Sequence, residues 1–204
     1  MSEFKNITNG TILSYSEYIQ WVEQLVIEGK TSGHNQTEAL AGFTALNLKR
    51  MQRIGKTLHL SDQITSTLKE LEQQQDWWVI TEAWWGDSAQ NLPVIGRLAS
   101  ESGGKINLHI ILRDDNPELM DRHHTNGSKS IPKLIAFGKE GNELFTWGPR
   151  PELAQQLLLD WKANLNGRSW DDFEKELHTW YAKDKTHSIQ KEINGLIHKK
   201  IAAY

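Results

Sequence analysis

The sequence predicts an α/β protein in which a central mixed sheet is flanked by helices. Two short apolar stretches, residues 77–83 and 106–112, are separated by a segment with helical periodicity, the pattern of a parallel strand–helix–strand crossover. Residues 133–137 and 143–147 flank the Gly-containing turn 138–142 and predict an antiparallel hairpin. Helical patterns on both sides of this region predict extensions at both ends.

The segment before the first strand has helical spacing throughout. Ser14 or Ser16 precedes one amphipathic run, and Thr37 and Ser61 stand before two more, each a residue type favoured at the N-cap. We therefore predict that residues 1–60 form an N-terminal helical extension packed on the core.

The segment after the hairpin is also helical. Gly148-Pro149-Arg150-Pro151 starts a helix, since proline presets the backbone of a first turn. Residues 61–165 are predicted to form the α/β domain. Residues 166–204 are predicted to form a C-terminal helical extension that contains an extra C-terminal helix. Gly195 is the weak point of this helix, because glycine disfavours helical structure.

Composition excludes several classes of partner. The 204 residues carry a net charge of −3, which gives no basic field of the kind that holds nucleic acid. Residues 1–6 lack the basic stretch of a secretion signal, and no apolar run approaches the ~20 residues that span a bilayer. We expect a cytoplasmic protein with neither a nucleic-acid nor a membrane partner, and leave its oligomeric state open.

The chain contains no cysteine, which excludes a disulfide, a thiolate nucleophile and any cysteine-ligated metal centre within it. Asp121, His123 and His124, with Asp114 and Asp115 upstream, are conceivable metal ligands. Adjacent residues on a helix do not share a face, so we favour solvated loop residues over a metal site. No metal and no cofactor are expected.

The most informative segment is the turn after the first predicted strand, Trp84-Trp85-Gly86-Asp87-Ser88. A dithiol enzyme would carry Trp-Cys-Gly-x-Cys at such a turn, and here Trp85 and Ser88 occupy the two cysteine positions. Dithiol chemistry needs one sulfur to attack from a helix N-terminus and a second to resolve the mixed disulfide. Thiol–disulfide exchange by this chain alone is therefore excluded, and we assign no catalytic residue.

Three anchors accompany this order of elements. They are Trp84 and Gly86 in the turn, Pro132 at the start of the hairpin, and Gly148 at its end. With them the chain resembles the thioredoxin-like superfamily over about residues 60–165. It is most similar to a poorly characterised bacterial branch of thioredoxin family proteins, with both cysteine positions substituted.

The resemblance implies that the peptide bond before Pro132 is cis and that this proline packs beside the turn. Ile131 and Pro132 would then face Trp85, and a partner's extended chain would lie in the groove between them. Trp85 either closes this groove or forms an exposed anchor for a partner. The predicted groove residues are Trp84, Trp85, Gly86, Asp87, Ile131, Pro132 and Arg150.

Three polar side chains near the turn have structural explanations. Ser88 or Asp87 is expected to cap the helix that follows the turn. Arg150 belongs to a loop whose glycine and prolines are explained by backbone geometry, but its guanidinium could hold a carboxylate or phosphate at the groove.

Glu82 lies in an apolar strand, where a carboxylate is costly unless it is paired. Arg113 or Lys133 is its expected partner. Arg113 is also expected to pair with Asp114 and to order the loop at this end of the sheet.

The leading functional hypothesis is a non-catalytic binding or interaction module that holds a protein or peptide partner in the groove beside Pro132. One alternative is a glutathione-binding or transferase-like enzyme whose thiol comes from the substrate, although Trp85 offers no hydroxyl to contact that thiol. The other alternative is a divergent or altered member of a thiol–disulfide oxidoreductase family.

Overall fold

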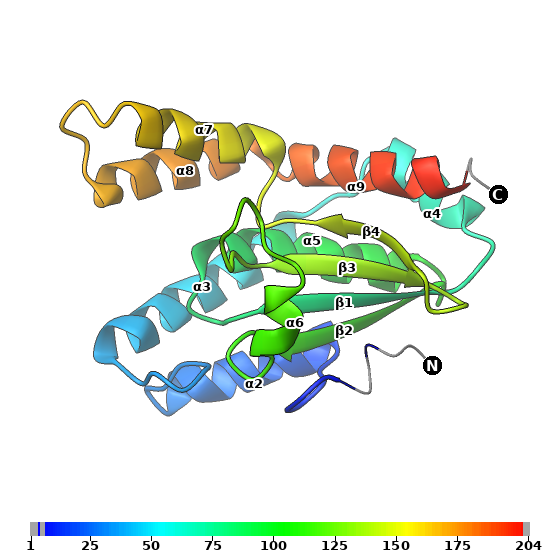
Figure 1. Ribbon diagram of the computed structural model, residues 1–204, viewed down its shortest axis with the longest axis horizontal. Helices are drawn as coiled ribbons and strands as arrows, with labels where there is room; N and C mark the ends of the chain where they lie inside the picture. Colours follow the sequence, from blue (N-terminus) through cyan, green and yellow to red (C-terminus); the bar gives the residue numbers. More distant parts are fainter. Residues whose placement is uncertain (1–3, 5–6, 202–204) are drawn as a thin grey trace.

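The computed structural model describes residues 4 and 7–201 (Figure 1). Its helices before the sheet are α2 (Tyr15–Ile27), α3 (Glu38–Thr57) and α4 (Asp62–Glu70). The central region comprises β1 (Gln75–Thr81), α5 (Gly86–Glu101), β2 (Ile106–Leu112), α6 (Pro117–Asp121), β3 (Lys133–Gly138) and β4 (Glu143–Trp147). The last helices are α7 (Glu152–Ala163), α8 (Trp170–Asp184) and α9 (His187–Ile201).

The strands form one mixed sheet in the order β2-β1-β3-β4. β1 is parallel to β2 and antiparallel to β3, and β3 is antiparallel to β4. The predicted crossover unit and hairpin are therefore both confirmed. β1 is one of the two inner strands and ends at Thr81, two residues earlier than its apolar sequence suggests.

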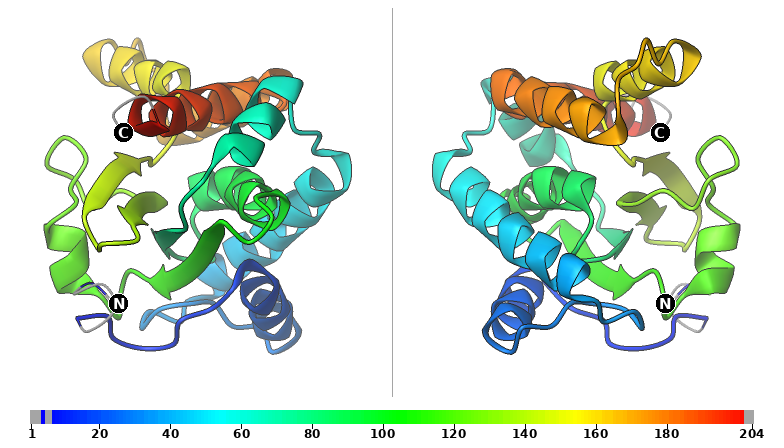
Figure 2. Two further views of the ribbon diagram at one scale, coloured as in Figure 1. Left: turned by 90° about the vertical axis from the view of Figure 1, so that its right-hand side faces the viewer. Right: turned by 90° about the vertical axis from the view of Figure 1, so that its left-hand side faces the viewer.

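The two faces of the sheet are covered unequally. Trp77 and Val79 on one face of β1 belong to a large apolar cluster that includes side chains of α2, α3, α5 and α9. Trp78 and Ile80 on the opposite face pack in a smaller cluster with Leu119 and other apolar side chains. Figure 2 shows this arrangement from the ends of the molecule, with α3 and α5 on one side of the sheet and α6 on the other.

The N-terminal helices begin where their caps predict. Ser14 forms a capping box with Glu17, and the Thr37 and Ser61 side chains accept hydrogen bonds from the first turns of α3 and α4. α3 is the longest of the described helices and carries charged residues such as Lys49 and Arg53 along its exposed side. None of the helices within residues 4 and 7–201 has the length and apolar character needed to cross a membrane.

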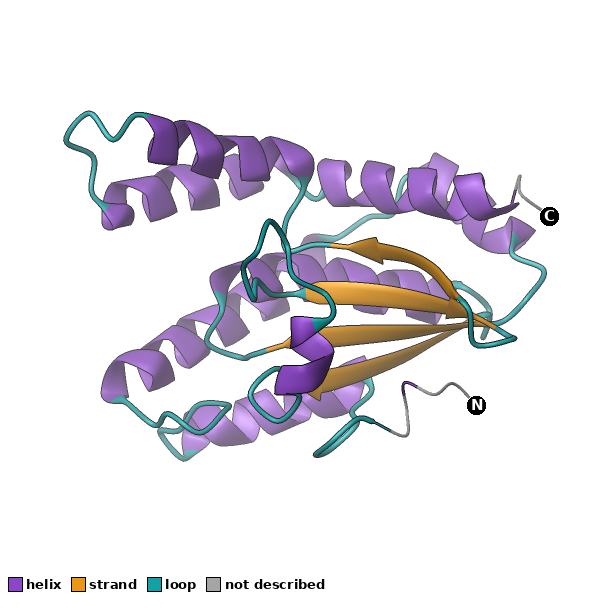
Figure 3. Ribbon diagram, in the orientation of Figure 1, coloured by secondary structure: helices purple, strands orange, loops and turns teal. Residues whose placement is uncertain are grey.

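The C-terminal region contains a break that helical periodicity does not reveal. Lys185 and Thr186 have φ values of 50° and 69°, in the left-handed region, so α8 ends there and α9 starts as a separate helix. Gly195, the predicted weak point, lies inside α9 between the buried Ile193 and Ile197. Figure 3 shows α7 and α8 as an antiparallel pair that extends past the end of the sheet.

A substitution at Gly148 tests the close contact between the end of the hairpin and Pro132. Its φ is +110°, and an added Cβ would collide with the carbonyl oxygen of Pro132. Gly148→Ala should therefore lower the free energy of unfolding by more than about 1 kcal/mol. Gly42 in α3 is a matched control, because a Cβ there meets no atom within 4 Å. Gly42→Ala should stabilise by about 0.5–1 kcal/mol. Urea unfolding of both variants measures the difference, and an unchanged Gly148→Ala contradicts the prediction.

Candidate functional site

The turn after β1 starts α5 without a side-chain cap. Gly86 is the first helical residue, and Trp85 occupies the N-cap position with no side-chain hydrogen bond to the first turn. Ser88 is buried and its Oγ atom has no hydrogen-bond partner among the described residues. The expectation that Ser88 or Asp87 caps α5 is therefore wrong, because the Asp87 carboxylate is directed to other partners.

Asp87 is the centre of a buried polar network. Arg150 Nη2 donates a hydrogen bond of 2.6 Å to Asp87 Oδ2, and the Tyr181 hydroxyl donates one of 2.7 Å to Oδ1. The Asp87 and Arg150 side chains are only 4% and 5% exposed. Burial raises the pKa of Asp87, while the Arg150 charge and the hydrogen bonds from Tyr181 and Arg150 oppose this rise. Arg150 thus holds a carboxylate, as the sequence suggested, but this carboxylate belongs to the chain itself.

Asn91 extends the network one turn further along α5. Its Nδ2 atom donates to the Asp87 carbonyl oxygen at 2.9 Å and to the Tyr181 hydroxyl oxygen at 3.1 Å. Tyr181 is therefore both donor and acceptor at this centre. These bonds hold α8 against the N-terminal turns of α5.

A cavity of about 240 Å³ opens beside the turn, between α3 and α8. Residues of the predicted groove line it, namely Trp84, Trp85, Gly86, Asp87 and Arg150. The remaining walls come from helices far away in the sequence. The site therefore joins the turn to both helical regions that flank it in the chain.

Ile131 and Pro132 lie outside the lining of this cavity. Both are buried, and the peptide bond between them is cis. Ile131 belongs to the apolar cluster on the α6 face of the sheet, and the half-buried Trp85 packs against that same cluster. Trp85 thus contacts the Ile131 cluster and also forms part of the cavity wall.

Two nitrogen-bearing side chains converge on Gly86. A Cβ added to Gly86 would lie 3.3 Å from His178 Nε2 and 3.7 Å from Arg50 Nη1. The side-chain amide of Gln90 donates to His178 Nδ1 at 3.1 Å, so the ring proton is on Nε2. Burial, together with the nearby charges of Arg50, Arg150 and Arg53, lowers the pKa of His178 to about 4. His178 is therefore a neutral hydrogen-bond donor at pH 7.

The mouth of the cavity is apolar. Phe43, Leu46 and Trp170 all line it, and they are 47%, 44% and 45% exposed. Phe43 and Leu46 come from α3, and Trp170 comes from the start of α8, where its ring lies 5.2 Å from that of Phe173. Exposed apolar side chains gathered at one opening are typical of an interaction surface.

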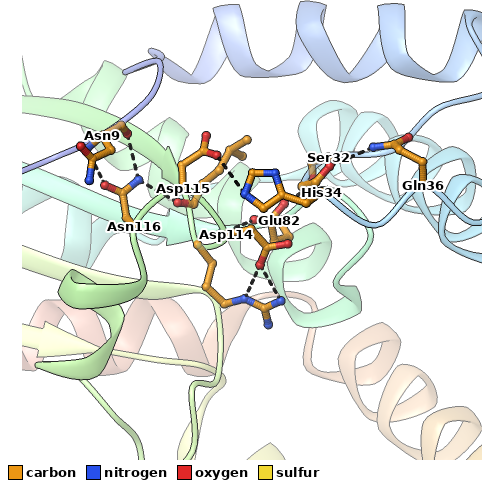
Figure 4. A network of polar contacts seen from close by, with 11 residues as sticks. Asn9, Ser32, His34, Gln36, Glu82, Asp114, Asp115 and Asn116 are labelled. Atoms are coloured by element: carbon orange, nitrogen blue, oxygen red, sulfur yellow. Dashed lines mark hydrogen bonds and ion pairs between the residues drawn. The ribbon is translucent and has the colours of Figure 1, made fainter.

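A second polar network lies at the end of β1 (Figure 4). The Ser32 hydroxyl donates to Glu82 Oε2, and the Asp114 backbone N–H donates to Oε1 at 2.9 Å. Ser32 also accepts a hydrogen bond of 2.7 Å from the Ala83 backbone N–H. Burial raises the pKa of Glu82, and these hydrogen bonds oppose the rise. The network ties the loop before α3 to the end of the sheet.

The expected ion-pair partners of Glu82 have other contacts. Arg113 Nη2 pairs with Asp114 Oδ1 at 2.9 Å, which confirms that predicted pair, and its guanidinium lies 5.1 Å from the Trp84 ring centroid. Lys133 donates to the Thr125 hydroxyl and to the Gly148 carbonyl oxygen. The expectation that Arg113 or Lys133 is the paired partner of Glu82 is therefore wrong, because Ser32 and a backbone N–H already satisfy the carboxylate.

The candidate metal ligands have separate partners. His124 pairs with Asp121 at 3.2 Å, while His123 contacts the Leu119 carbonyl oxygen and Glu143. In the part of the chain that the structure describes, no three His, Asp or Glu side chains are grouped closely enough to hold a metal ion.

Sequence reasoning missed the contributions of Arg50, His178 and Tyr181 to the site. His178 and Tyr181 are spaced by three residues on α8, so the sequence could have placed these two side chains on one helical face. It could not show that this face meets Gly86, which lies more than ninety residues earlier in the numbering.

The family model described as Thioredoxin matches residues 33–165, which is more than half of the chain. The chain therefore belongs to the thioredoxin family. The match starts before α3 and ends after α7, so it includes the Phe43 and Leu46 side of the cavity.

Solved structures share this fold at low sequence identity. A protein of unknown function from Pseudomonas aeruginosa is 20% identical with a TM-score of 0.55, over 92% of this chain and 98% of that chain. An HIV epitope-scaffold is 20% identical with a TM-score of 0.53, over 92% of this chain and 99% of the scaffold. Comparison with curated proteins gave no significant match.

The depressed pKa of His178 predicts an acid-sensitive interface between α5 and α8. As the pH falls from 6.5 towards 4, the unfolded chain gains a proton at this histidine while the folded chain does not, so the free energy of unfolding falls. The full shift corresponds to about 3 kcal/mol, which partial solvent access at the ring reduces to roughly 1–2 kcal/mol. Chemical denaturation at pH 7 and pH 4.5 measures the loss.

His178→Gln is the matched control for this measurement, because glutamine keeps a polar side chain without a titrating group. The pH-dependent loss should be smaller in the variant by that same amount. Equal losses in the two proteins would show that His178 is not the group responsible.

Proposed function

We propose that this protein is a non-catalytic binding module of the thioredoxin family, which holds an apolar group of a protein partner in the cavity beside the turn. The observation that carries the proposal is the meeting of Trp84 and Trp85 with the exposed Phe43, Leu46 and Trp170 around one opening. In this proposal the predicted helical extensions, residues 1–60 and 166–204, supply the outer walls of the site.

The chemistry of the turn supports binding over catalysis. Without a cysteine, the chain has neither the attacking nor the resolving thiol of a dithiol enzyme. The alcohol at the second cysteine position, Ser88, has no hydrogen-bond partner among the described residues, so no base is placed to activate it. Trp85 at the first position supplies a large flat surface and no nucleophile.

The dimensions of the cavity support a partner protein over a large cofactor. Pockets for drug-sized molecules usually enclose roughly 300–1,000 Å³, and this cavity encloses about 240 Å³. A space of this size suits a single inserted side chain. The exposed apolar rim then provides contact area outside the cavity, in the way that an anchor residue is surrounded by supporting contacts.

The position of the site differs from the groove inferred by resemblance. Because Ile131 and Pro132 are buried and do not line the cavity, we place the partner on the α3–α8 side of Trp85. Trp84 and Trp85, whose rings lie 5.4 Å apart in an edge-to-face arrangement, then form the wall between the partner and the core.

A negative charge introduced among the exposed apolar residues around the cavity opening tests the proposal. Peptides selected from a random library displayed on phage should bind the purified protein, and Leu46→Asp should weaken them at least tenfold by placing a carboxylate against their apolar anchor. Isothermal titration calorimetry measures the affinities. Ile27→Asp is the matched control, because Ile27 is an exposed apolar residue at the end of α2 outside the cavity lining.

Selected peptides that bind wild type, Leu46→Asp and Ile27→Asp equally would refute this location of the site. Titration with glutathione provides the comparison with the transferase-like alternative, which our proposal expects to show no saturable binding.

A further inference from the structure

The inner end of the cavity has more hydrogen-bond donors than acceptors. Arg150 donates to Asp87 through Nη2 only, and its buried Nε and Nη1 atoms have no acceptor among the described residues. Only 5% of the Arg150 side chain is exposed. A buried guanidinium with unmet donors points to an acceptor that comes from outside the chain.

Arg50 and His178 bring further donors to the same place. Arg50 Nη1 is hydrogen-bonded to the Asn47 side-chain oxygen at 2.9 Å, and no acid in the described part of the chain forms an ion pair with this guanidinium. His178 Nε2–H faces Gly86 beside Arg50 Nη1. Glu174 also lines the cavity and acts on the Arg50 charge from a distance.

The backbone adds to this arrangement. α5 spans 16 residues and begins at Gly86, so the positive end of its dipole and its first unpaired N–H groups face the same region. Among the described residues, the acid that is bonded within this donor group is Asp87, whose two oxygens are already occupied by Arg150 and Tyr181.

We propose that the occupant of the cavity is the C-terminal residue of a partner polypeptide, with its free carboxylate toward Arg50, His178 and the unpartnered donors of Arg150, and its apolar side chain against Leu46 and Trp170. This inference rests on the proposed function and names the chemistry of the bound group. A chain terminus is the peptide group that carries a carboxylate and a large apolar side chain on one residue. Capture of a C-terminal carboxylate by backbone and side-chain donors is a recurring mode of peptide recognition.

The apolar mouth favours a polypeptide over a free small acid. Phe43, Leu46 and Trp170 are nearly half exposed around the opening, so they extend the contact surface beyond a cavity of about 240 Å³. A terminal residue fills the cavity, and the preceding residues of the same chain cover the mouth.

Two synthetic peptide pools test the inference. Each consists of Gly-Ser-Gly-Ser followed by one varied terminal residue, with a free carboxylate in the first pool and a carboxamide in the second. Tryptophan fluorescence and calorimetry measure binding. We expect peptides with a large apolar terminal residue to bind at least tenfold more tightly as free acids than as amides, and 3-phenylpropionate to bind more weakly than the peptides.

Substitutions of Arg50 and His178 test whether these hydrogen-bond donors cause the preference for free acids over amides. Arg50→Gln and His178→Gln should reduce the affinity for the free acid towards that for the amide, without weakening the amide. Arg53→Gln removes a nearby exposed charge from the same helix outside the cavity lining and should keep the preference for the acid. Leu46→Asp should weaken both peptide forms.

The outcomes separate the two proposals. Equal binding of acids and amides overturns the C-terminal inference and leaves the proposed function intact. The same conclusion follows if neither pool binds while library-selected peptides remain sensitive to Leu46→Asp. Tighter binding of 3-phenylpropionate than of any peptide also overturns it in favour of a small amphipathic acid. Insensitivity of every bound peptide to Leu46→Asp overturns both.

Discussion

The buried carboxylate of Asp87 is the constraint on which the site depends. A buried charge costs several kcal/mol unless it is paired and hydrogen-bonded. Arg150 from the loop after β4 and Tyr181 from α8 meet this requirement at 2.6 and 2.7 Å. Because an unpaired Asp87 would be costly, the start of α5, the loop and α8 are held in one arrangement, and all three contribute to the wall of the cavity.

The need to pair Asp87 explains how the turn of the thioredoxin fold keeps its structure in a chain that has no cysteine for dithiol chemistry. In a dithiol enzyme the residue at the position of Trp85 must remain accessible to attack a substrate. Here the indole packs against the Ile131 cluster and also lines the cavity, so it acts as a wall between core and opening. The helix N-terminus that would stabilise a thiolate instead faces the side chains of Arg50 and His178.

The sequence could predict those features that depend on local pattern. The period of apolar residues placed the strands, the Gly-containing turn placed the hairpin, and the pair Ser14 and Ser16 placed the start of α2 to within two residues, since each of these signals lies within a few residues. Break points set by backbone dihedrals alone were invisible, as at Lys185, where the side-chain pattern continues through a left-handed residue.

The site itself was only partly predictable, because its contacts are distant in sequence. Asp87 is separated from Arg150 by 63 positions and from Tyr181 by 94. An amphipathic pattern identifies the buried face of α8 but does not say which element covers it. For the same reason Glu82 was assigned a charged partner, whereas the fold supplies Ser32 from a loop 50 residues away.

Hydrogen exchange measured by mass spectrometry on Tyr181→Phe tests most directly whether Asp87 holds α8 to the turn. Loss of this hydroxyl leaves one Asp87 oxygen unpaired, so amide protection should fall together in α8 and in the first turn of α5, and stay unchanged in α2. Tyr18→Phe is the control, because the buried Tyr18 hydroxyl has no partner among the described residues, and its exchange should match wild type. Faster exchange confined to α8, or no change in either helix, would contradict the account.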